Sequence, residues 1–154
     1  MVIPKGLFKV LKEILRHLLK RPVVGITILA EDPNGRIVLI RRADTGEWAL
    51  PGGTVEWGET LRGTAVRELQ EEAGVETLAL GELAGVYSAP ERDPRFHAVT
   101  VVVRAKVHSE MRGPENPLEI REARFFSASD LPEDLSHGTG DMLRNALEGQ
   151  CVWE

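Results

Sequence analysis

Short apolar runs separated by turn residues dominate the chain, and most of them are rich in β-branched residues. Five such runs, each expected to form a strand, occupy residues 23–31, 36–42, 78–87, 98–108 and 119–126. The sequence Asp32-Pro33-Asn34-Gly35 separates the first two runs, and it predicts a hairpin there. Residues 99–103 are apolar at nearly every position, which favours a central place in the sheet.

Two other segments show helical spacing. In residues 60–73 the apolar positions recur every three or four residues, and Gly74 follows where a helix commonly ends. These positions are Leu61, Ala65, Val66, Leu69 and Ala73. Residues 141–148 are expected to form a closing helix, and residues 47–51 to lead into a glycine turn. Together the elements predict one α/β domain over residues 21–154, with helices on both faces of a mixed sheet.

Residues 1–20 predict an amphipathic helix appended to this domain. Its apolar stripe consists of Leu7, Phe8, Leu11, Ile14, Leu15, Leu18 and Leu19. Basic residues dominate the opposite face, against the single acid Glu13. Docking on its own domain or on a partner subunit is the favoured role; a membrane-surface anchor and a flap that gates substrate are the alternatives.

Three carboxylates within residues 60–73 indicate a site for cations. Glu68, Glu71 and Glu72 stand at i, i+3 and i+4, and we expect them to share the helix face opposite the apolar stripe. Their hard oxygens favour Mg²⁺ or Mn²⁺ over zinc. Arg67 lies beside Glu68 and is placed to orient it, and the Gly52 carbonyl is a further candidate ligand. The alternative is an ordinary solvated face rich in Glu.

The same segment carries a longer pattern. Residues 53–75 fit G-x5-E-x7-R-E-U-x-E-E-x-G-U, where U is apolar, at all nine specified positions, including Gly53, Glu59 and Gly74. This pattern resembles the Nudix box, the signature of hydrolases that cleave nucleoside diphosphates linked to another moiety. The resemblance implies an α/β/α sandwich, and it implies that Glu68, Glu71 and Glu72 hold metal ions and that Glu68 lies near the attacking water.

In several subgroups of this family the general base comes from a downstream loop instead. The candidates in this chain lie in residues 113–123, and they are Glu115, Glu119 and Glu122. Each is individually more typical of a surface acid, with Glu119 and Glu122 slightly favoured. The alternative to activity is a chain that keeps the fold but has lost catalysis.

Residues 87–97 read YSAPERDPRFH, which is unusual for a plain hairpin. The segment is similar to a motif of Nudix proteins classed as ADP-ribose pyrophosphatases. Its two arginines, Arg92 and Arg95, are suited to clamping a phosphate or the terminal ribose. His97 is a further candidate in the loop, although a histidine there more often orders the chain, and Asp93 is placed to hold the turn by pairing with Arg95.

Other candidate substrate residues flank this segment. Tyr87 or Trp48 is suited to stacking on a base, and Trp48 is equally typical of a core residue. Arg41 and Arg42 end a predicted strand just before the site. Because adjacent strand residues point to opposite faces, only one of these two is expected to reach phosphate.

Composition agrees with one small enzyme. The chain has 154 residues, 42% of them hydrophobic, which is enough for a single core. No apolar run approaches the length of a membrane span, and the solitary Cys151 predicts a reducing cytoplasm. The net charge of −5 argues against sequence-independent binding of nucleic acid.

We therefore expect a Mg²⁺-dependent hydrolase that splits ADP-ribose or a related nucleoside diphosphate sugar into a nucleoside monophosphate and a sugar phosphate. The enzymatic alternative resembles the MutT group, which releases pyrophosphate from nucleoside triphosphates. A non-catalytic sensor of nucleotide sugars is the alternative from another class. A homodimer is compatible with the resemblance, because many Nudix enzymes pair their subunits.

Overall fold

The computed structural model describes residues 10–15 and 21–154. Its strands are β1 (Val23–Glu31), β2 (Ile37–Arg42), β3 (Trp48–Ala49), β4 (Gly52–Thr54), β5 (Val75–Tyr87), β6 (Ala98–Met111), β7 (Ile120–Phe126) and β8 (Val152–Trp153). Its helices within residues 21–154 are α2 (Leu61–Glu68), the π-helix η1 (Leu69–Ala73), the short 3-10 helix η2 (Pro90–Arg92) and α3 (Thr139–Leu147).

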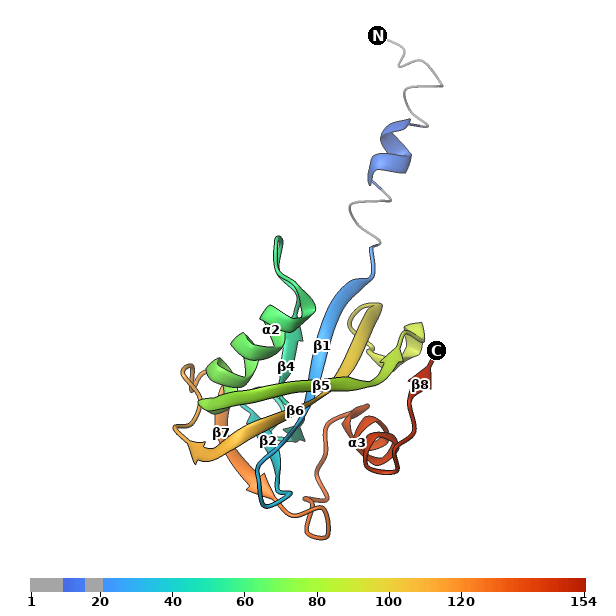
Figure 1. Ribbon diagram of the computed structural model, residues 1–154. Coiled ribbons are helices and arrows are strands. Elements are labelled where there is room, and N and C mark those ends of the chain that lie inside the picture. The colour runs from blue at the N-terminus through green and yellow to red at the C-terminus, as the bar shows by residue number, and fades with distance from the viewer. Residues whose placement is uncertain (1–9, 16–20) are drawn as a thin grey trace.

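The strands form one mixed eight-stranded sheet in the order β3-β2-β1-β6-β5-β8, with β4 paired to β1 and β7 paired to β2 (Figure 1). β1 runs parallel to β6 along its whole length, and β5 and β6 form a long antiparallel pair. β6 therefore lies between two strands that cover its backbone on both edges, which confirms the central position expected for residues 99–103.

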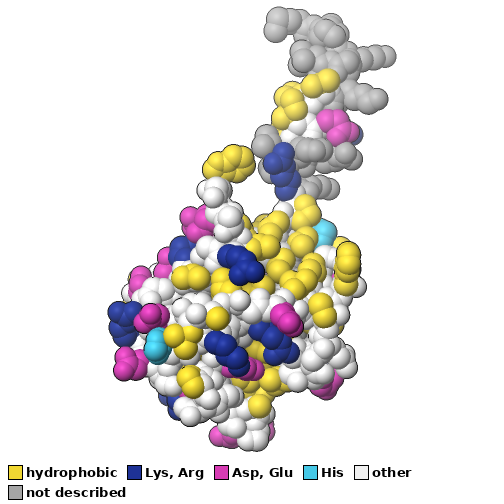
Figure 2. Space-filling model, in the orientation of Figure 1, with side chains coloured by type: hydrophobic (Ala, Val, Ile, Leu, Met, Phe, Trp, Pro, Cys, Tyr) yellow, Lys and Arg dark blue, Asp and Glu magenta, His cyan; other side chains and the backbone are white. Residues whose placement is uncertain are grey.

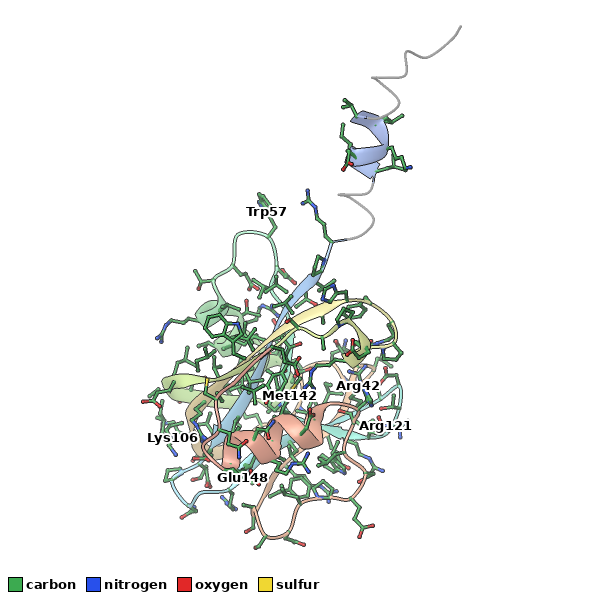
Figure 3. All side chains as sticks on the ribbon, turned by 90° about the vertical axis from the view of Figure 1, so that its right-hand side faces the viewer. Arg42, Trp57, Lys106, Arg121, Met142 and Glu148 are labelled. Carbon is green, nitrogen blue, oxygen red and sulfur yellow. The ribbon has the colours of Figure 1, made fainter. Side chains whose placement is uncertain are left out.

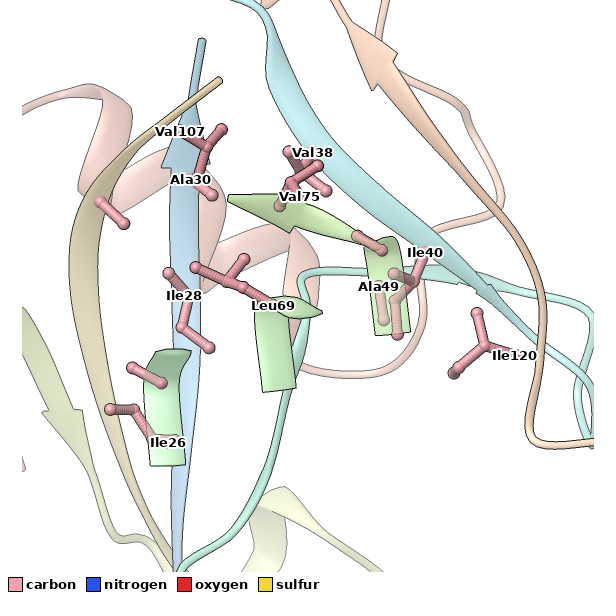
Figure 4. Packing of buried hydrophobic residues seen from close by; sticks show 13 residues of the cluster. Ile26, Ile28, Ala30, Val38, Ile40, Ala49, Leu69, Val75, Val107 and Ile120 are labelled. Atoms are coloured by element: carbon pink, nitrogen blue, oxygen red, sulfur yellow. The ribbon is translucent and has the colours of Figure 1, made fainter. Parts of the chain in front are cut away.

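Alternation along β1 divides the core between the two faces of the sheet. Ile26, Ile28 and Ala30 point into a cluster that α2 and η1 cover with Ala65 and Leu69 (Figure 4). Leu29, on the other face, belongs to a second cluster that α3 covers with Leu143 and Ala146. A strand with period-two side chains and apolar residues at nearly every position needs cover on both sides, and the sandwich predicted from the sequence is confirmed.

The predicted hairpin between β1 and β2 is confirmed, but it is short: the strands pair at Glu31 and Ile37, after which β1 continues along β4 and β6 and β2 continues along β3 and β7. Other local expectations need correction. The glycines 52–53, expected in a turn, belong to β4. The two-residue strand β8 was not predicted, because so short a run has no recognisable period.

The helix expected over residues 60–73 is also less regular than its spacing indicates. It begins as an α-helix capped by the Thr60 side chain, which accepts a hydrogen bond from the Gly63 N–H at 3.1 Å. From Leu69 onward it is a π-helix, which ends at Gly74 with φ of 64°. Leu61 and Val66, counted in the apolar stripe, are 38% and 44% exposed. π-helical turns commonly accompany functional sites, and this one carries two of the three glutamates.

The N-terminal helix is described only in part. Residues 10–15 are helical and stand apart from the domain in Figure 1, whereas 1–9 and 16–20 lie outside the described residues, so its role stays a prediction. Figure 2 shows hydrophobic side chains gathered beside the start of β1, where Val24 is 45% exposed. No helix in the described ranges is long and apolar enough to cross a membrane.

A buried acid holds the turn between β1 and β2. Asp32 is 1% exposed and accepts hydrogen bonds from the Asn34 and Arg36 backbone N–H groups and from Arg36 Nε. Burial acts to raise the pKa of this carboxyl, but the bonds from Arg36 and Asn34 outweigh it and lower the pKa to about 2. The charged form therefore stabilises the fold.

We predict that Asp32→Asn lowers the free energy of unfolding by about 2 kcal/mol near neutral pH, because charge-assisted hydrogen bonds are lost. Since the folded pKa lies below the usual value, wild-type stability from this group is present above pH 4 and is lost as the pH falls toward 2. Urea denaturation at several pH values measures both effects. The exposed turn residue Asp130, replaced by Asn, is the control, and an equal loss in both variants would contradict the prediction.

Candidate active site

Arg67, in the last turn of α2, binds three carboxylates at once. Its Nε and Nη2 donate to the two oxygens of Glu59 at 2.8 and 3.0 Å. Its Nη1 donates to Glu68 at 2.8 Å and to Glu71 at 3.1 Å. Glu59 also accepts from the Glu56 N–H, and the bonds from Arg67 lower its pKa to about 2. This network ties the loop before α2 to the helix itself.

The glutamates of the helix do not share one solvent face, as the regular spacing indicated. Glu68 and Glu72 are 8% and 9% exposed on the side that packs toward β4, whereas the Glu71 side chain is 45% exposed. Burial raises the pKa of Glu68. Burial also raises the pKa of Glu72 to about 8, and the neighbouring carboxylates of Glu68 and Glu119 add to that effect, against a hydrogen bond from the Gly52 N–H.

Two glycines of β4 allow this close approach. The Gly52 N–H donates to Glu72 Oε2 at 2.8 Å, and a Cβ at Gly52 would lie 2.2 Å from the Ile26 carbonyl oxygen of β1. A Cβ at Gly53 would lie 2.2 Å from Glu68 Oε1. Glycine is favoured at these positions for different reasons: a side chain at Gly52 would press on the backbone of β1, and one at Gly53 would displace the Glu68 carboxylate.

These carboxylates line a cavity of about 880 Å³. The cavity is bounded by β1, β4, the α2–η1 helix, the loop before β6 and the loop before β7. Its charged lining includes Glu68, Glu71, Glu72, Glu115, Glu119 and Arg67. A cavity of this size accommodates a nucleotide-sized ligand.

Two arginine–aspartate pairs line the same cavity. Arg42 donates to Asp44 at 2.9 and 2.7 Å, and Arg95 donates to Asp93 at 3.0 and 2.8 Å. The pKa of each arginine is raised by its aspartate, while the charge of Arg95 opposes that of Arg42. The loops that carry these pairs therefore lie near one another, although 50 residues of chain separate them.

The other candidate substrate residues lie outside this lining. Trp48 and Tyr87 are 5% and 1% exposed and belong to the core around α3, which favours the core interpretation over base stacking. Arg41 donates to the Gly46 carbonyl and pairs with Glu122 at 3.3 Å, so of the two adjacent arginines it is Arg42 that lines the cavity.

Two residues of the 87–97 segment have structural partners instead. His97 Nε2 bonds the Ser88 carbonyl oxygen at 2.9 Å, which orders the loop. Arg92 pairs with Asp141 and Glu154. It is not one of the described residues that line the cavity. Of the acids on the downstream segment, Glu115 and Glu119 line the cavity and Glu122 does not.

The donor chemistry of the cavity fits a divalent cation. Burial, and then the neighbouring carboxylates of Glu68 and Glu119, destabilise the charged form of Glu72, and a bound cation relieves this destabilisation. Within residues 10–15 and 21–154, no three acid, histidine or cysteine side chains already stand in a metal-binding arrangement. Arg67 bonds one oxygen each of Glu68 and Glu71, and the Gly52 N–H bonds one oxygen of Glu72, so each carboxylate keeps its second oxygen for a cation.

The sequence did not single out three features of the lining. Asp44 forms a pair with Arg42, and Phe96 and Leu118 line the cavity while being 41% and 89% exposed. Exposed apolar residues are recognised only once the cavity is known, because an isolated apolar residue in a loop carries no period. Among the described residues that line the cavity, Phe96 is the one aromatic residue.

The NUDIX domain family model matches residues 19–146. The chain belongs to the Nudix family. This match confirms the resemblance seen in the box, and it agrees with the prediction of a pyrophosphohydrolase. The α2–η1 helix, the glycines before it and the Arg67 network thus form the segment that carries the Nudix box pattern.

Relatives of this Nudix protein carry different names. An ADP-ribose pyrophosphatase of Methanocaldococcus jannaschii is 38% identical over 116 residues, which cover 73% of this chain and 66% of the archaeal one. A MutT-like protein of Streptomyces ambofaciens is 42% identical over 132 residues, covering 82% and 76%. The crystal structure of a MutT Nudix hydrolase from Burkholderia pseudomallei superposes with a TM-score of 0.71 at 31% identity, covering 82% and 98%.

We predict that the glycines of β4 respond differently to alanine. Gly53→Ala displaces the Glu68 carboxylate and lowers Nudix turnover at least about tenfold, with a small change in melting temperature. Gly52→Ala pushes against the backbone of β1 and lowers the melting temperature by several degrees, roughly 1–3 kcal/mol.

The matched control is Gly63→Ala in α2, where the added Cβ meets its nearest atom, Thr60 Oγ1, at 3.4 Å. This variant should keep its turnover and gain up to about 1 kcal/mol of stability, because alanine favours a helix over glycine. Differential scanning fluorimetry and initial rates measure the three variants together. Normal turnover by Gly53→Ala would show that Glu68 does not depend on this approach.

Proposed function

We propose that this Nudix hydrolase uses Mg²⁺ to split the pyrophosphate bond of ADP-ribose or a related nucleoside diphosphate sugar. The products are a nucleoside monophosphate and a sugar phosphate. The observation that carries the proposal is one cavity that joins the box carboxylates to Arg42 and Arg95. The name of the Methanocaldococcus jannaschii relative, which is an ADP-ribose pyrophosphatase, supports this substrate class.

Arg42 and Arg95 are the residues proposed to bind the substrate. A guanidinium held by one aspartate keeps N–H groups for a phosphate or a ribose hydroxyl, and two such groups on facing loops bracket an extended ligand. The aspartates pre-orient the arginines, so less side-chain entropy is lost on binding. Phe96 offers an exposed ring in the same lining as a surface for a base or ribose.

Glu68, Glu71 and Glu72, with the Gly52 carbonyl, are the residues proposed to hold Mg²⁺. When bound there, the ion supplies positive charge for the phosphoryl oxygens and lowers the pKa of water. Arg67 then serves to keep Glu68 and Glu71 in place through its bonds to Glu59.

Glu119 is proposed as the general base. It lines the cavity, and its charge acts on both Glu68 and Glu72, which places it close to the box. Its carboxylate takes a proton from the attacking water as the water oxygen bonds to phosphorus. The bond from phosphorus to the bridging oxygen breaks, and the second phosphate leaves with that oxygen. Glu122 is tied to Arg41 and Arg124 instead.

Two other functions would give different products or none. A MutT-like enzyme, the name carried by the Streptomyces ambofaciens relative, would release pyrophosphate from a nucleoside triphosphate. A non-catalytic sensor would bind a nucleotide sugar without turnover, and the intact carboxylate set argues against it. The cytoplasmic location and the homodimer stay predictions from the sequence.

We predict Mg²⁺-dependent conversion of ADP-ribose to AMP and ribose 5-phosphate, and loss of this conversion in chelator. Chromatographic separation of the products from ADP-ribose, other nucleoside diphosphate sugars and dNTPs tests the three functions in one panel. Pyrophosphate released from a dNTP, with ADP-ribose untouched, would establish the MutT-like function. Thermal stabilisation by ADP-ribose without any turnover would favour the sensor.

We predict that Glu72→Gln lowers turnover by roughly 100-fold and raises stability in chelator. The folded pKa of about 8 lies above the usual 4.5, so the ionised group costs stability that grows as the pH rises from 4.5 to 8. The variant should match the wild type near pH 4 and exceed it at pH 8 in denaturant melts. Glu122→Gln is the control, and a Glu72→Gln protein of normal rate would refute this assignment.

A further inference from the structure

The loop that carries Arg95 and Phe96 into the cavity has few apolar contacts to hold it. It spans residues 88–97 between β5 and β6, and η2 is its only regular element. Phe96 is 41% exposed and the Arg95 side chain is 58% exposed. Because ordering an exposed loop costs conformational entropy, a site built on it needs contacts that fix its backbone.

Arg92 supplies the densest set of such contacts. Its Nη1 donates to Asp141 of α3 at 2.6 Å, and its Nε and Nη2 donate to the Glu154 carboxylate. Its guanidinium also lies over the Tyr87 ring, 4.5 Å from the centroid, and Asn145 of α3 bonds the Tyr87 hydroxyl. All three nitrogens of the guanidinium are thus engaged.

Glu154 binds the same loop through its backbone. Its Oε2 accepts the N–H groups of Ser88 and Ala89 at 3.0 and 3.1 Å, and its carbonyl oxygen accepts the Ser88 hydroxyl. The bonds from Arg92 lower the pKa of Glu154 to about 2, so the carboxylate is charged at every physiological pH. β8 holds Glu154 there by pairing with β5.

These contacts lie outside the cavity but next to it in the chain. Arg92, Asp141 and Glu154 are absent from the cavity lining among the described residues, whereas Asp93 and Arg95 belong to it. Arg92 is paired with two carboxylates, so the cluster carries net negative charge and repels a phosphate. Arg92 is therefore unsuited to clamp the substrate. At the far end of the loop, His97 bonds Ser88 and its carbonyl oxygen accepts the Val23 N–H.

We propose that Arg92 and Glu154 are positioning residues, which fix the 88–92 part of the loop so that Arg95 and Phe96 face the substrate. The inference rests on the proposed function for the ligand, but the anchoring itself does not. Because α3 supplies Asp141, the anchor also connects the cavity to the helix on the opposite face of the sheet.

The test compares Glu154→Gln and Arg92→Lys with the wild-type protein in two measurements. The first is hydrogen–deuterium exchange of peptides covering residues 93–97 without ligand, which is independent of activity. The second is the KM and kcat for ADP-ribose with Mg²⁺. We expect faster exchange and a KM raised about tenfold, with kcat within about twofold. The control is Glu148→Gln, which changes an exposed acid at the C-cap of α3 (Figure 3).

A double-mutant cycle separates positioning from a general loss of stability. If Glu154 acts through Arg95, Glu154→Gln should have little further effect on KM once Arg95→Gln is present, whereas independent effects would multiply. Unchanged exchange, multiplying effects or an unchanged KM would each overturn the proposal. If the wild-type protein leaves ADP-ribose intact but the variants still exchange faster, the anchor is supported and the proposed function is overturned.

Discussion

The guanidinium group of Arg67 determines where the carboxylates of the box stand. Its N–H groups donate to Glu59 before the helix, to Glu68 in the helix and to Glu71 in the π-helical turn. Without that cation, like charges at this spacing oppose one another and oppose burial. The glycines of β4 complete the arrangement, since they let Glu68 and Glu72 approach the sheet. The cavity therefore concentrates negative charge that only partly cancels.

Sequence patterns account for most of the scaffold. The five predicted strands exist. Residues 99–103 lie in the central strand β6, because they are apolar on both faces of the sheet and need cover from the α2–η1 helix on one face and from α3 on the other. The failures share a physical origin. Two of the three residues of β4 are glycines, which carry no side-chain period, and the strand forms by pairing with Gly25, Ile26 and Thr27 of β1. The π-helix follows α2 without a break and buries Leu69, Glu72 and Ala73, and no feature of the sequence spacing distinguishes it from a continued α-helix.

The candidate site residues also fall into two groups, those that line the cavity and those that lie elsewhere. Residues with an unusual local pattern, such as the box glutamates and Arg95, line the cavity. Tyr87, Trp48 and Arg92 share the chemistry of substrate residues, but the fold turns them toward the core or toward Asp141 and Glu154. Which side chain faces a ligand depends on the partners that β8 and α3 bring, and those partners lie some 50 to 60 residues further along the chain.

Calorimetry of Mg²⁺ binding to the full chain and to two variants is the decisive measurement. We predict that Glu72→Gln weakens binding about tenfold or more, whereas Glu122→Gln, which changes a residue outside the cavity, binds as the wild type does. Equal affinity in all three proteins would contradict the claim that the buried carboxylates of this cavity hold the cation.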